Sequence, residues 1–294
     1  MAKSFNKSNV VVTQQSAKVG NVRFYQRKGE TYIRSAHNAV KSNPRTDKQM
    51  HQRLQFVSRA VIWRALKDKL KKAFTTKVGN QSDYNVFTML NNGKGVYFTK
   101  QQAAKGAQVI FPVQISDGSL PSIVTSMNRG QLKTNIALAS LVLDANTTIG
   151  EFANAVVAGN EDFNFGDVLI FVSVLQTVNG EGIPKIKGEF SGVKLIKGDR
   201  RKVLNVVPAE AFQNVDGCLG TAPNLPVGCF AYLHTRSNSK LDVSSQTLVS
   251  NNELLIAQYT SEEQYLLARD SYGKANELFL SQGSNPVVDE TEKK

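Results

Sequence analysis

The chain has 294 residues, of which 41% are apolar, so it can bury one large or two ordinary hydrophobic cores and is not a disordered chain. No run of about 18 apolar residues would cross a membrane, and no apolar stretch typical of a secretory signal follows the N-terminal lysines. We expect a protein with no membrane partner, in a reducing cytosol where Cys218 and Cys229 remain free thiols. One disulfide between them is the alternative.

The formal net charge of +12 is concentrated at one end. Residues 1–80 hold 18 Lys and Arg against 3 Asp and Glu, a net +15, whereas residues 81–294 hold 18 against 21, a net −3. A basic segment on a near-neutral body is a local electrostatic feature that favours contact with a polyanion. The alternative is a solvated face that keeps the protein in solution.

The N-terminal region predicts a β-hairpin followed by basic amphipathic helices. Residues 22–25 and 31–33 alternate in polarity across a turn at 27–30, where Gly29 suits a positive φ. A long helix is expected within residues 43–76, with Thr46 and Gln49 as a capping box. Its apolar stripe has two rows, listed here in order: Met50, Leu54, Val57 and Val61, then Phe56, Ala60, Trp63, Leu66, Leu70 and Ala73.

A shorter helix is expected from Ser82 to a stop at residues 91–93. From about residue 107 the pattern changes to strands. Thr148 and Glu151 predict a capped helix among them at 149–158, and Asn179-Gly180 predicts a hairpin turn. The expected strands cover residues 108–115, 123–128, 136–143, 168–177, 185–196, 203–207, 229–235 and 246–249.

These elements predict an α+β fold: a β-hairpin plus basic amphipathic helices, then a β-rich sandwich- or barrel-like body with an inserted helix. We place the basic hairpin-plus-helix domain at residues 1–106 and the β-rich domain at 107–281, with a last helix at 262–271. Residues 282–294 are polar and are expected to form a disordered tail.

No catalytic, metal or cofactor pattern is present. The three histidines, His37, His51 and His234, have no Asp or Glu at metal-ligand spacing, and Cys218-x10-Cys229 does not match a zinc site. Nucleophile-elbow, phosphate-loop and dinucleotide motifs are absent. We therefore expect a protein that is not an enzyme, with no metal and no cofactor. The alternative is a hydrolase whose two facing carboxylates come from distant positions in the sequence.

The candidate nucleic-acid contacts are cations of the hairpin and the long helix. Such contacts bind phosphates without reading sequence. Phe24, Tyr25 and Tyr32 alternate with some of these cations and are candidates for base stacking, with simple hairpin packing as the alternative. A helix lying on anionic lipid is a further alternative. The candidates are Arg23, Arg27, Lys28, Arg34, Arg45, Arg53, Arg59, Arg64, Lys67, Lys71 and Lys72.

The N-terminal motifs resemble a family of proteins of Bacteroidota and their phages that is classed as a domain of unknown function. The signature reads KVGNV at 18–22, RKG at 27–29, YIRS at 32–35 and NPRT at 43–46, followed by Gln49 and Gln52-Arg53. The resemblance covers residues 18–90 and implies a bacterial or phage protein, in the bacterial cytoplasm or in a virion. It implies no activity, ligand or catalytic residue.

Two functions follow as expectations. The first is a structural protein of a phage particle or its assembly, whose basic region contacts nucleic acid while the body contacts other virion proteins or further copies of the chain. The second is a protein–protein assembly module whose basic face binds an acidic subunit.

Overall fold

The computed structural model describes residues 2–4, 18–19, 22–27, 30–35, 47–95, 106–128, 130–178, 184–238 and 240–251. The chain divides into two compact units, Met1–Arg45 and Thr46–Lys294. Each unit is described by itself. The division falls before the basic helices, whereas the sequence placed a boundary near residue 106.

The N-terminal unit is a four-stranded antiparallel sheet in the order β1-β4-β3-β2. Its central pair is the expected hairpin, in which Tyr25 lies opposite Tyr32 and Phe24 opposite Ile33. The strands are β1 (Ala2–Ser4), β2 (Lys18–Val19), β3 (Val22–Arg27) and β4 (Glu30–Ser35).

Two helices begin the second unit, α1 (Asp47–Leu66) and α2 (Asp83–Leu90). The Ser82 side chain caps α2 by accepting a hydrogen bond from the N–H of Asn85, and the helix begins one residue after the start expected at Ser82. In α1 the buried face differs in part from the expected stripe: Ile62 and Leu66 are fully buried, whereas Phe56 and Val57 are exposed.

The centre of this unit is an antiparallel sheet in the order β13-β12-β8-β9, with β15 also paired to β12. Both faces are buried. Val172 and Val174 of β8 pack in the core that contains α1 and α2, while the alternating Leu169 and Phe171 pack in a second core. The strands are β8 (Val168–Val178), β9 (Pro184–Lys194), β12 (Gly228–Ser237), β13 (Leu241–Val243) and β15 (Val249–Ser250).

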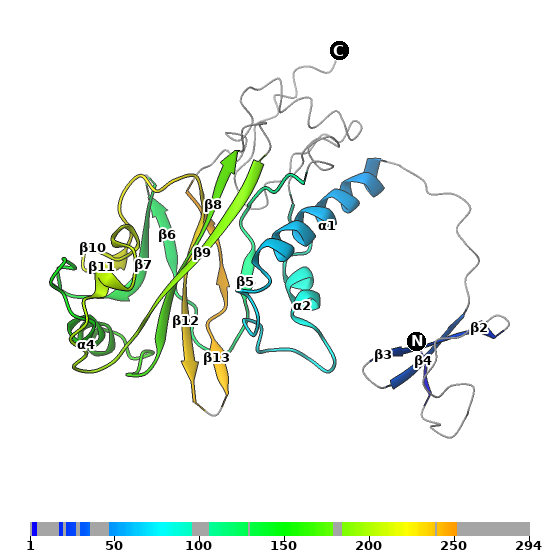
Figure 1. The fold of residues 1–294 in the computed structure, drawn as a ribbon, viewed down its shortest axis with the longest axis horizontal. Coiled ribbons are helices and arrows are strands. Elements are labelled where there is room, and N and C mark those ends of the chain that lie inside the picture. Colours follow the sequence, from blue (N-terminus) through cyan, green and yellow to red (C-terminus); the bar gives the residue numbers. More distant parts are fainter. Residues whose placement is uncertain are drawn as a thin grey trace, which may run out of the picture. The chain divides into compact units, whose positions relative to one another are not determined.

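The second core is covered by another antiparallel sheet, in the order β10-β11-β7-β6, and by α4, so the body has helices, sheet and sheet in layers (Figure 1). The capping box of Thr148 and Glu151 at α4 is confirmed. These elements are β6 (Thr125–Asn128), β7 (Gln131–Ala137), α4 (Ile149–Gly159), β10 (Gln213–Val215) and β11 (Cys218–Gly220), with β5 (Gln114–Ser116) and β14 (Gln246–Thr247) forming a small separate pair.

The α+β, β-rich fold class is confirmed, and so is the helix inserted among the strands. The strand expected at 203–207 is wrong: it contains a short 3-10 helix, η1 (Val203–Asn205), and a second one, η2 (Ala209–Ala211), follows it. Cys218 and Cys229 are free thiols. The Thr46 cap, the Asn179-Gly180 turn, the helix at 262–271 and the tail at 282–294 lie outside the described residues.

The helices α1 and α2 do not form a domain apart from the strands. Leu66 of α1 and Phe87 of α2 share one core with Val174 of β8 and Ala231 of β12. Because that core is built from both sides of residue 106, the basic helices and the β-rich body are one packed unit.

Candidate nucleic-acid interface

The eleven predicted contact residues fall into three groups. Lys28 and Arg45 lie outside the described residues. Three belong to the N-terminal sheet and six to residues 47–72, which we call the α1 segment. The sheet group is Arg23, Arg27 and Arg34; the α1 group is Arg53, Arg59, Arg64, Lys67, Lys71 and Lys72.

In the N-terminal sheet the aromatic residues contact each other. The rings of Tyr25 and Tyr32 are stacked with centroids 5.5 Å apart, and the Arg34 guanidinium lies 5.4 Å from the centre of the Tyr25 ring. Arg34 is exposed, and Arg23 is its cross-strand neighbour in the backbone register. The two tyrosines therefore pack against each other within the hairpin, and the Arg34 guanidinium lies over the Tyr25 ring.

The α1 segment carries five of its predicted cations on the surface. Arg53 and Arg64 are exposed and separated by 11 residues, close to three helical turns, so they lie on the same face of α1. Lys67, Lys71 and Lys72 continue the exposed series in the turn that follows the helix. The exposed Phe56 and Val57 lie between the two arginines.

Arg59 is a correction to the predicted set, because its side chain is only 5% exposed. Its Nη1 donates a hydrogen bond of 2.9 Å to the carbonyl oxygen of Asn91, the residue that ends α2. The side chain of Asn91 in turn bridges α2 to Gln114 of β5. Burial lowers the pKa of Arg59, and its Nε has no hydrogen-bond partner among the described residues. Arg59 therefore fixes α1 to α2 and does not face a phosphate.

Few acidic side chains lie near the exposed cations of the α1 segment. Lys71 pairs with Asp68 at 3.0 Å, and the side chains of both are 72% exposed. The hydrogen bond from Lys71 lowers the pKa of Asp68. Such a solvated pair is screened by salt and holds its partners weakly. Arg64, Lys67 and Lys72 make no ion pair within the described part of the chain.

A buried polar network in the body was missed by sequence reasoning. Asp167, directly before β8, is 2% exposed, and its carboxylate accepts hydrogen bonds from three groups. These are the Nε2–H of His234 at 2.8 Å, the Nε–H and Nη2–H of Arg236 at 2.9 and 2.8 Å, and the backbone N–H of Asn164 at 2.8 Å. Asp167 lies 67 and 69 residues from its two side-chain partners, so no local spacing could have revealed the network.

The charge states in this network follow from burial and hydrogen bonding. Burial by itself would raise the pKa of Asp167, but the hydrogen bonds from Arg236, Asn164 and His234 outweigh it and hold that pKa below its ordinary value. Burial lowers the pKa of His234 despite the neighbouring carboxylate. The network therefore contains an ionised Asp167, a charged Arg236 and a neutral His234 at pH 7.

The His234–Asp167 contact is not arranged for acid–base chemistry. His234 is 1% exposed, Nε2 is bonded to the carboxylate, and the ring of Phe163 stacks on the imidazole at 4.2 Å. A general base must reach a substrate proton, and this imidazole is enclosed. The described residues also contain no group of three or more His, Cys, Asp or Glu that could hold a metal ion.

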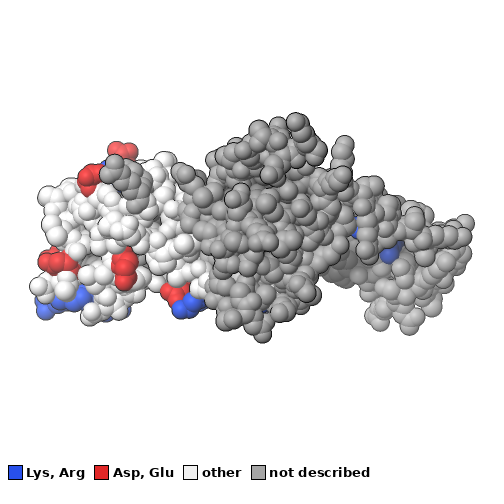
Figure 2. Space-filling view, turned by 90° about the horizontal axis from the view of Figure 1, so that it is seen from above, with Lys and Arg blue, Asp and Glu red and all other residues white. Residues whose placement is uncertain are grey.

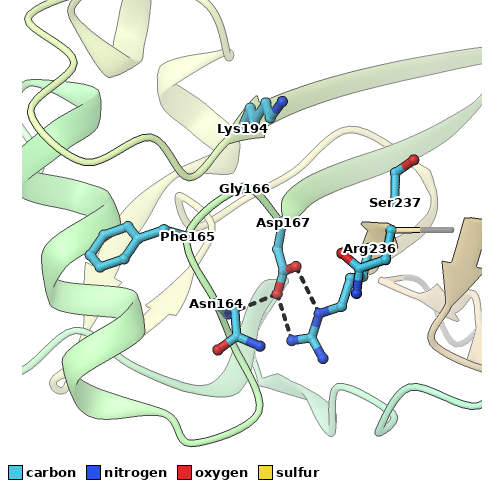
Figure 3. A pocket seen from close by; sticks show the side chains of 8 residues that line it. Asn164, Phe165, Gly166, Asp167, Lys194, Arg236 and Ser237 are labelled. Carbon is cyan, nitrogen blue, oxygen red and sulfur yellow. Dashed lines mark hydrogen bonds and ion pairs between the residues drawn. The ribbon is translucent and has the colours of Figure 1, made fainter.

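A small pocket of about 170 Å³ opens beside Asp167 at the end of the central sheet. Figure 3 shows the Arg236 guanidinium facing the Asp167 carboxylate, while Phe165 points away from it. Lys194 lies on the neighbouring strand end, because it pairs with Val168 in the β8–β9 register. The lining is polar and carries charge of both signs, and its residues are Asn164, Phe165, Gly166, Asp167, Lys194, Arg236, Ser237 and Asn238.

No protein-family model, curated protein or solved structure matches the chain. Within the part of the chain that the structure describes, none of the helices has both the length and the apolar character needed to cross a membrane.

Proposed function

We propose that the protein is a non-enzymatic structural protein whose basic N-terminal region, including the α1 segment, contacts nucleic acid without sequence specificity. The observation that carries this proposal is the series of exposed cations along the α1 segment, of which Arg64, Lys67 and Lys72 have no acidic partner in the described part of the chain. Arg53, on the same face of α1 as Arg64, adds a fourth exposed cation.

The physical basis of such binding is counterion release. Each phosphate that a Lys or Arg neutralises frees a condensed cation. The logarithm of the binding constant therefore falls linearly with the logarithm of the salt concentration. The α1 segment is well suited to this, because α1 is fixed to α2 and β5 through Arg59 and Asn91. A fixed helix loses little conformational entropy when it binds a strand.

We place this role in a phage particle or its assembly. The support is the resemblance of residues 18–90 to proteins of Bacteroidota and their phages, together with the polarised charge. A basic region can face a packaged genome, while a β-rich body contacts neighbouring virion proteins or further copies of the chain. This placement is an analogy with how such particles are built, and the genes that flank this one would test it: capsid or portal genes support it, and a metabolic operon contradicts it.

Fluorescence anisotropy with a random-sequence oligonucleotide tests the binding itself. We expect a micromolar Kd at low salt that weakens steeply as salt rises, because phosphate contacts dominate. The α1 variant, Arg64→Gln, Lys67→Gln and Lys72→Gln, should lower the salt slope by about 2 to 3. The control variant, Lys133→Gln, Lys187→Gln and Lys240→Gln, removes the same charge elsewhere on the body and should leave the slope unchanged. Absence of binding by the wild-type protein at low salt contradicts the proposal.

The second candidate is an assembly module whose basic face binds an acidic protein subunit. The observation in its favour is that Phe56 and Val57, 48% and 40% exposed, lie between Arg53 and Arg64 on α1. Exposed apolar residues rimmed by charge are typical of protein–protein contacts. The ratio of absorbance at 260 and 280 nm before and after nuclease treatment separates the two: a complex that survives nuclease with no nucleic-acid absorbance favours the second candidate.

A further inference from the structure

A second concentration of positive charge lies on the β-rich body, at residues 194–202, which we call the body loop. Five of its nine residues are Lys or Arg and one is Asp, whereas the other residues of 81–294 hold 13 Lys and Arg against 20 Asp and Glu. In Figure 2 most of the described surface in view is uncharged, with acidic and basic side chains both scattered over it. The near-neutral average of the body thus conceals one strongly basic segment.

Three cations of the body loop are available for a ligand. Arg201 pairs with Asp199 at 2.7 Å, and Lys202 donates to the carbonyl oxygen of Asn146. Lys194, Lys197 and Arg200 are exposed and make no ion pair within the residues that the structure describes.

The backbone of the body loop is held at both ends. Leu195 exchanges two backbone hydrogen bonds with the segment before β8, at 2.7 Å with Gly166 and 2.8 Å with Asp167. At the other end, the N–H groups of Ile149 and Gly150 donate to the carbonyl oxygens of Arg201 and Asp199, at 2.8 and 2.9 Å. These bonds also occupy the first N–H groups of α4, so the positive potential here comes from side chains and not from a helix terminus.

An exposed aromatic ring stands within this basic surface. Phe165 is 43% exposed, and the Lys197 ammonium lies 5.8 Å from the centre of its ring. Phe165 sits on a segment fixed by the Asp167 network, three residues before the start of β8. A rigidly presented aromatic ring beside cations is the arrangement with which proteins bind the bases and phosphates of single strands.

We infer that Phe165, Lys194, Lys197 and Arg200 form a second nucleic-acid contact on the body, separate from the α1 segment. Phosphates of the strand lie on the three cations, and one base packs against the exposed part of the Phe165 ring. The contact takes a single strand better than a duplex, because a paired base cannot stack on a side chain.

The ligand is a strand and not a free nucleotide. The three cations lie along residues 194–200, from the end of β9 into the segment that follows it, so a ligand with several phosphates can occupy them together. The adjoining pocket, about 170 Å³, contains Arg236, but the Nε and Nη2 of that arginine are already committed to Asp167. A repeating polyanion matches spread cations, whereas one phosphate group would gain only part of the charge.

The test compares three variants of the full chain in anisotropy titrations with a 20-nucleotide oligo(dT). The loop variant, Lys194→Gln, Lys197→Gln and Arg200→Gln, should weaken binding about tenfold at low salt and lower the salt slope by about 2 for single strands. The control variant at Lys133, Lys187 and Lys240 should bind as the wild type does. A loop variant that binds as tightly as the control variant overturns the inference.

Two further arms define the ligand. Phe165→Leu, at an exposed position, should weaken oligo(dT) about fivefold while a duplex of the same length is hardly affected, consistent with stacking energies of about 1–3 kcal/mol per base. An excess of thymidine monophosphate should fail to displace the oligonucleotide; displacement at millimolar concentration overturns the assignment of a strand.

The outcome is independent of the proposed function of the α1 segment. If the α1 variant retains wild-type binding and the loop variant loses it, the α1 segment is not the contact and the body loop is. If only the α1 variant loses binding, the reverse holds. Circular dichroism of each variant checks that all of them are folded.

Discussion

The α1 segment and the body loop show two ways in which positive charge is distributed in this molecule. The α1 segment holds 8 Lys and Arg against 2 Asp, and it lies within residues 1–80, whose net charge is +15, so its charge is visible in the average composition. In the body loop the charge is local and is cancelled in the average by acids elsewhere in residues 81–294. An arginine in or beside each region stabilises the fold through hydrogen bonds. Arg59 of the α1 segment is bonded to Asn91, and Arg236, which lies beside the body loop, is bonded to Asp167.

An arginine side chain can either stabilise the fold or face solvent, and burial together with its hydrogen bonds distinguishes the two cases. Arg59 and Arg64 lie on one helix, five residues apart, yet the first is 5% exposed and the second is exposed. Arg236 is partly exposed, but two of its nitrogens bind a buried carboxylate. A count of Lys and Arg in the sequence therefore overestimates the number of cations that can bind a phosphate. The hydrogen bonds in the structure show which cations are already used within the fold.

The largest effect on stability is expected from Asp167→Ala, which removes the hydrogen bonds that hold the segment carrying Phe165. Arg236 and His234 would lose their partner in a buried site, which costs about 3–5 kcal/mol of unfolding free energy. Urea denaturation measures this loss. The matched control is Asp162→Ala, because the hydrogen bond from Arg236 to Asp162 goes to the backbone carbonyl oxygen and survives the substitution; it should cost under about 0.5 kcal/mol. Equal effects of the two substitutions would show that the network does not stabilise the fold.

The next effect concerns the distance between the two basic regions. Leu66 at the end of α1 lies against β9, because a methyl group added at Gly188 would come within 2.5 Å of its Cδ2 atom. Lys194 ends the same strand six residues further on, which corresponds to roughly 20 Å at about 3.3 Å per residue. A nucleic acid longer than this distance can contact both regions at once.

We therefore expect the affinity to rise with ligand length by more than the larger number of binding positions on a longer ligand would produce. Oligo(dT) strands of about four and about fourteen nucleotides span roughly 14 and 48 Å at ~3.4 Å per nucleotide. The longer strand should bind at least about tenfold more tightly, about 1.4 kcal/mol. The loop variant should lose most of this advantage. The same length dependence in both proteins would show that the regions act separately.

Arg59→Met and Arg64→Met form the third test, on one helix. Arg59→Met removes the hydrogen bond to Asn91 and should cost about 1 kcal/mol of stability while binding to oligonucleotides is unchanged. Arg64→Met should leave stability within about 0.5 kcal/mol and reduce the salt slope by roughly one. Denaturation and anisotropy are measured on both proteins. A loss of affinity in folded Arg59→Met would return Arg59 to the interface.

Local signals carried much of the fold prediction. Ser82, Thr148 and Glu151 act through hydrogen bonds to residues three positions away, so their capping roles are encoded within a single turn. Strands such as β8 and β9 were recognisable because they are long and apolar or alternating. The error at 203–207 arose because Val203 and Val207 are buried through the packing of a short 3-10 turn and not through strand pairing.

The parts that could not be predicted depend on contacts between distant residues. Arg59 could not be distinguished from Arg64 by sequence, because its burial depends on Asn91, 32 residues away. His234 was noticed only as an isolated histidine, and its partner lies 67 residues earlier. Since Ile62 and Phe56 are both apolar, only the position of α2 and the central sheet decides which of them is buried.

The smallest expected effect is the pH dependence that His234 gives to stability. Burial lowers the pKa of His234 below its ordinary value of 6.5, so below pH 6.5 the unfolded chain binds a proton that the folded chain does not. Stability is therefore fully present above about pH 6.5 and declines as pH falls toward the folded-state pKa, with a slope of at most about 1.4 kcal/mol per pH unit for one proton.

His234→Gln should remove this decline, because a glutamine amide can still donate to Asp167 but does not titrate. Urea denaturation between pH 7.5 and 5 measures the slope in both proteins. The separate loss of stability below about pH 4, as Asp167 takes up a proton, should remain in the variant. Within the described network, only His234 has an ordinary pKa near this pH window. If the slope between pH 6.5 and 5 is unchanged in His234→Gln, the proton is taken up by a group outside the network.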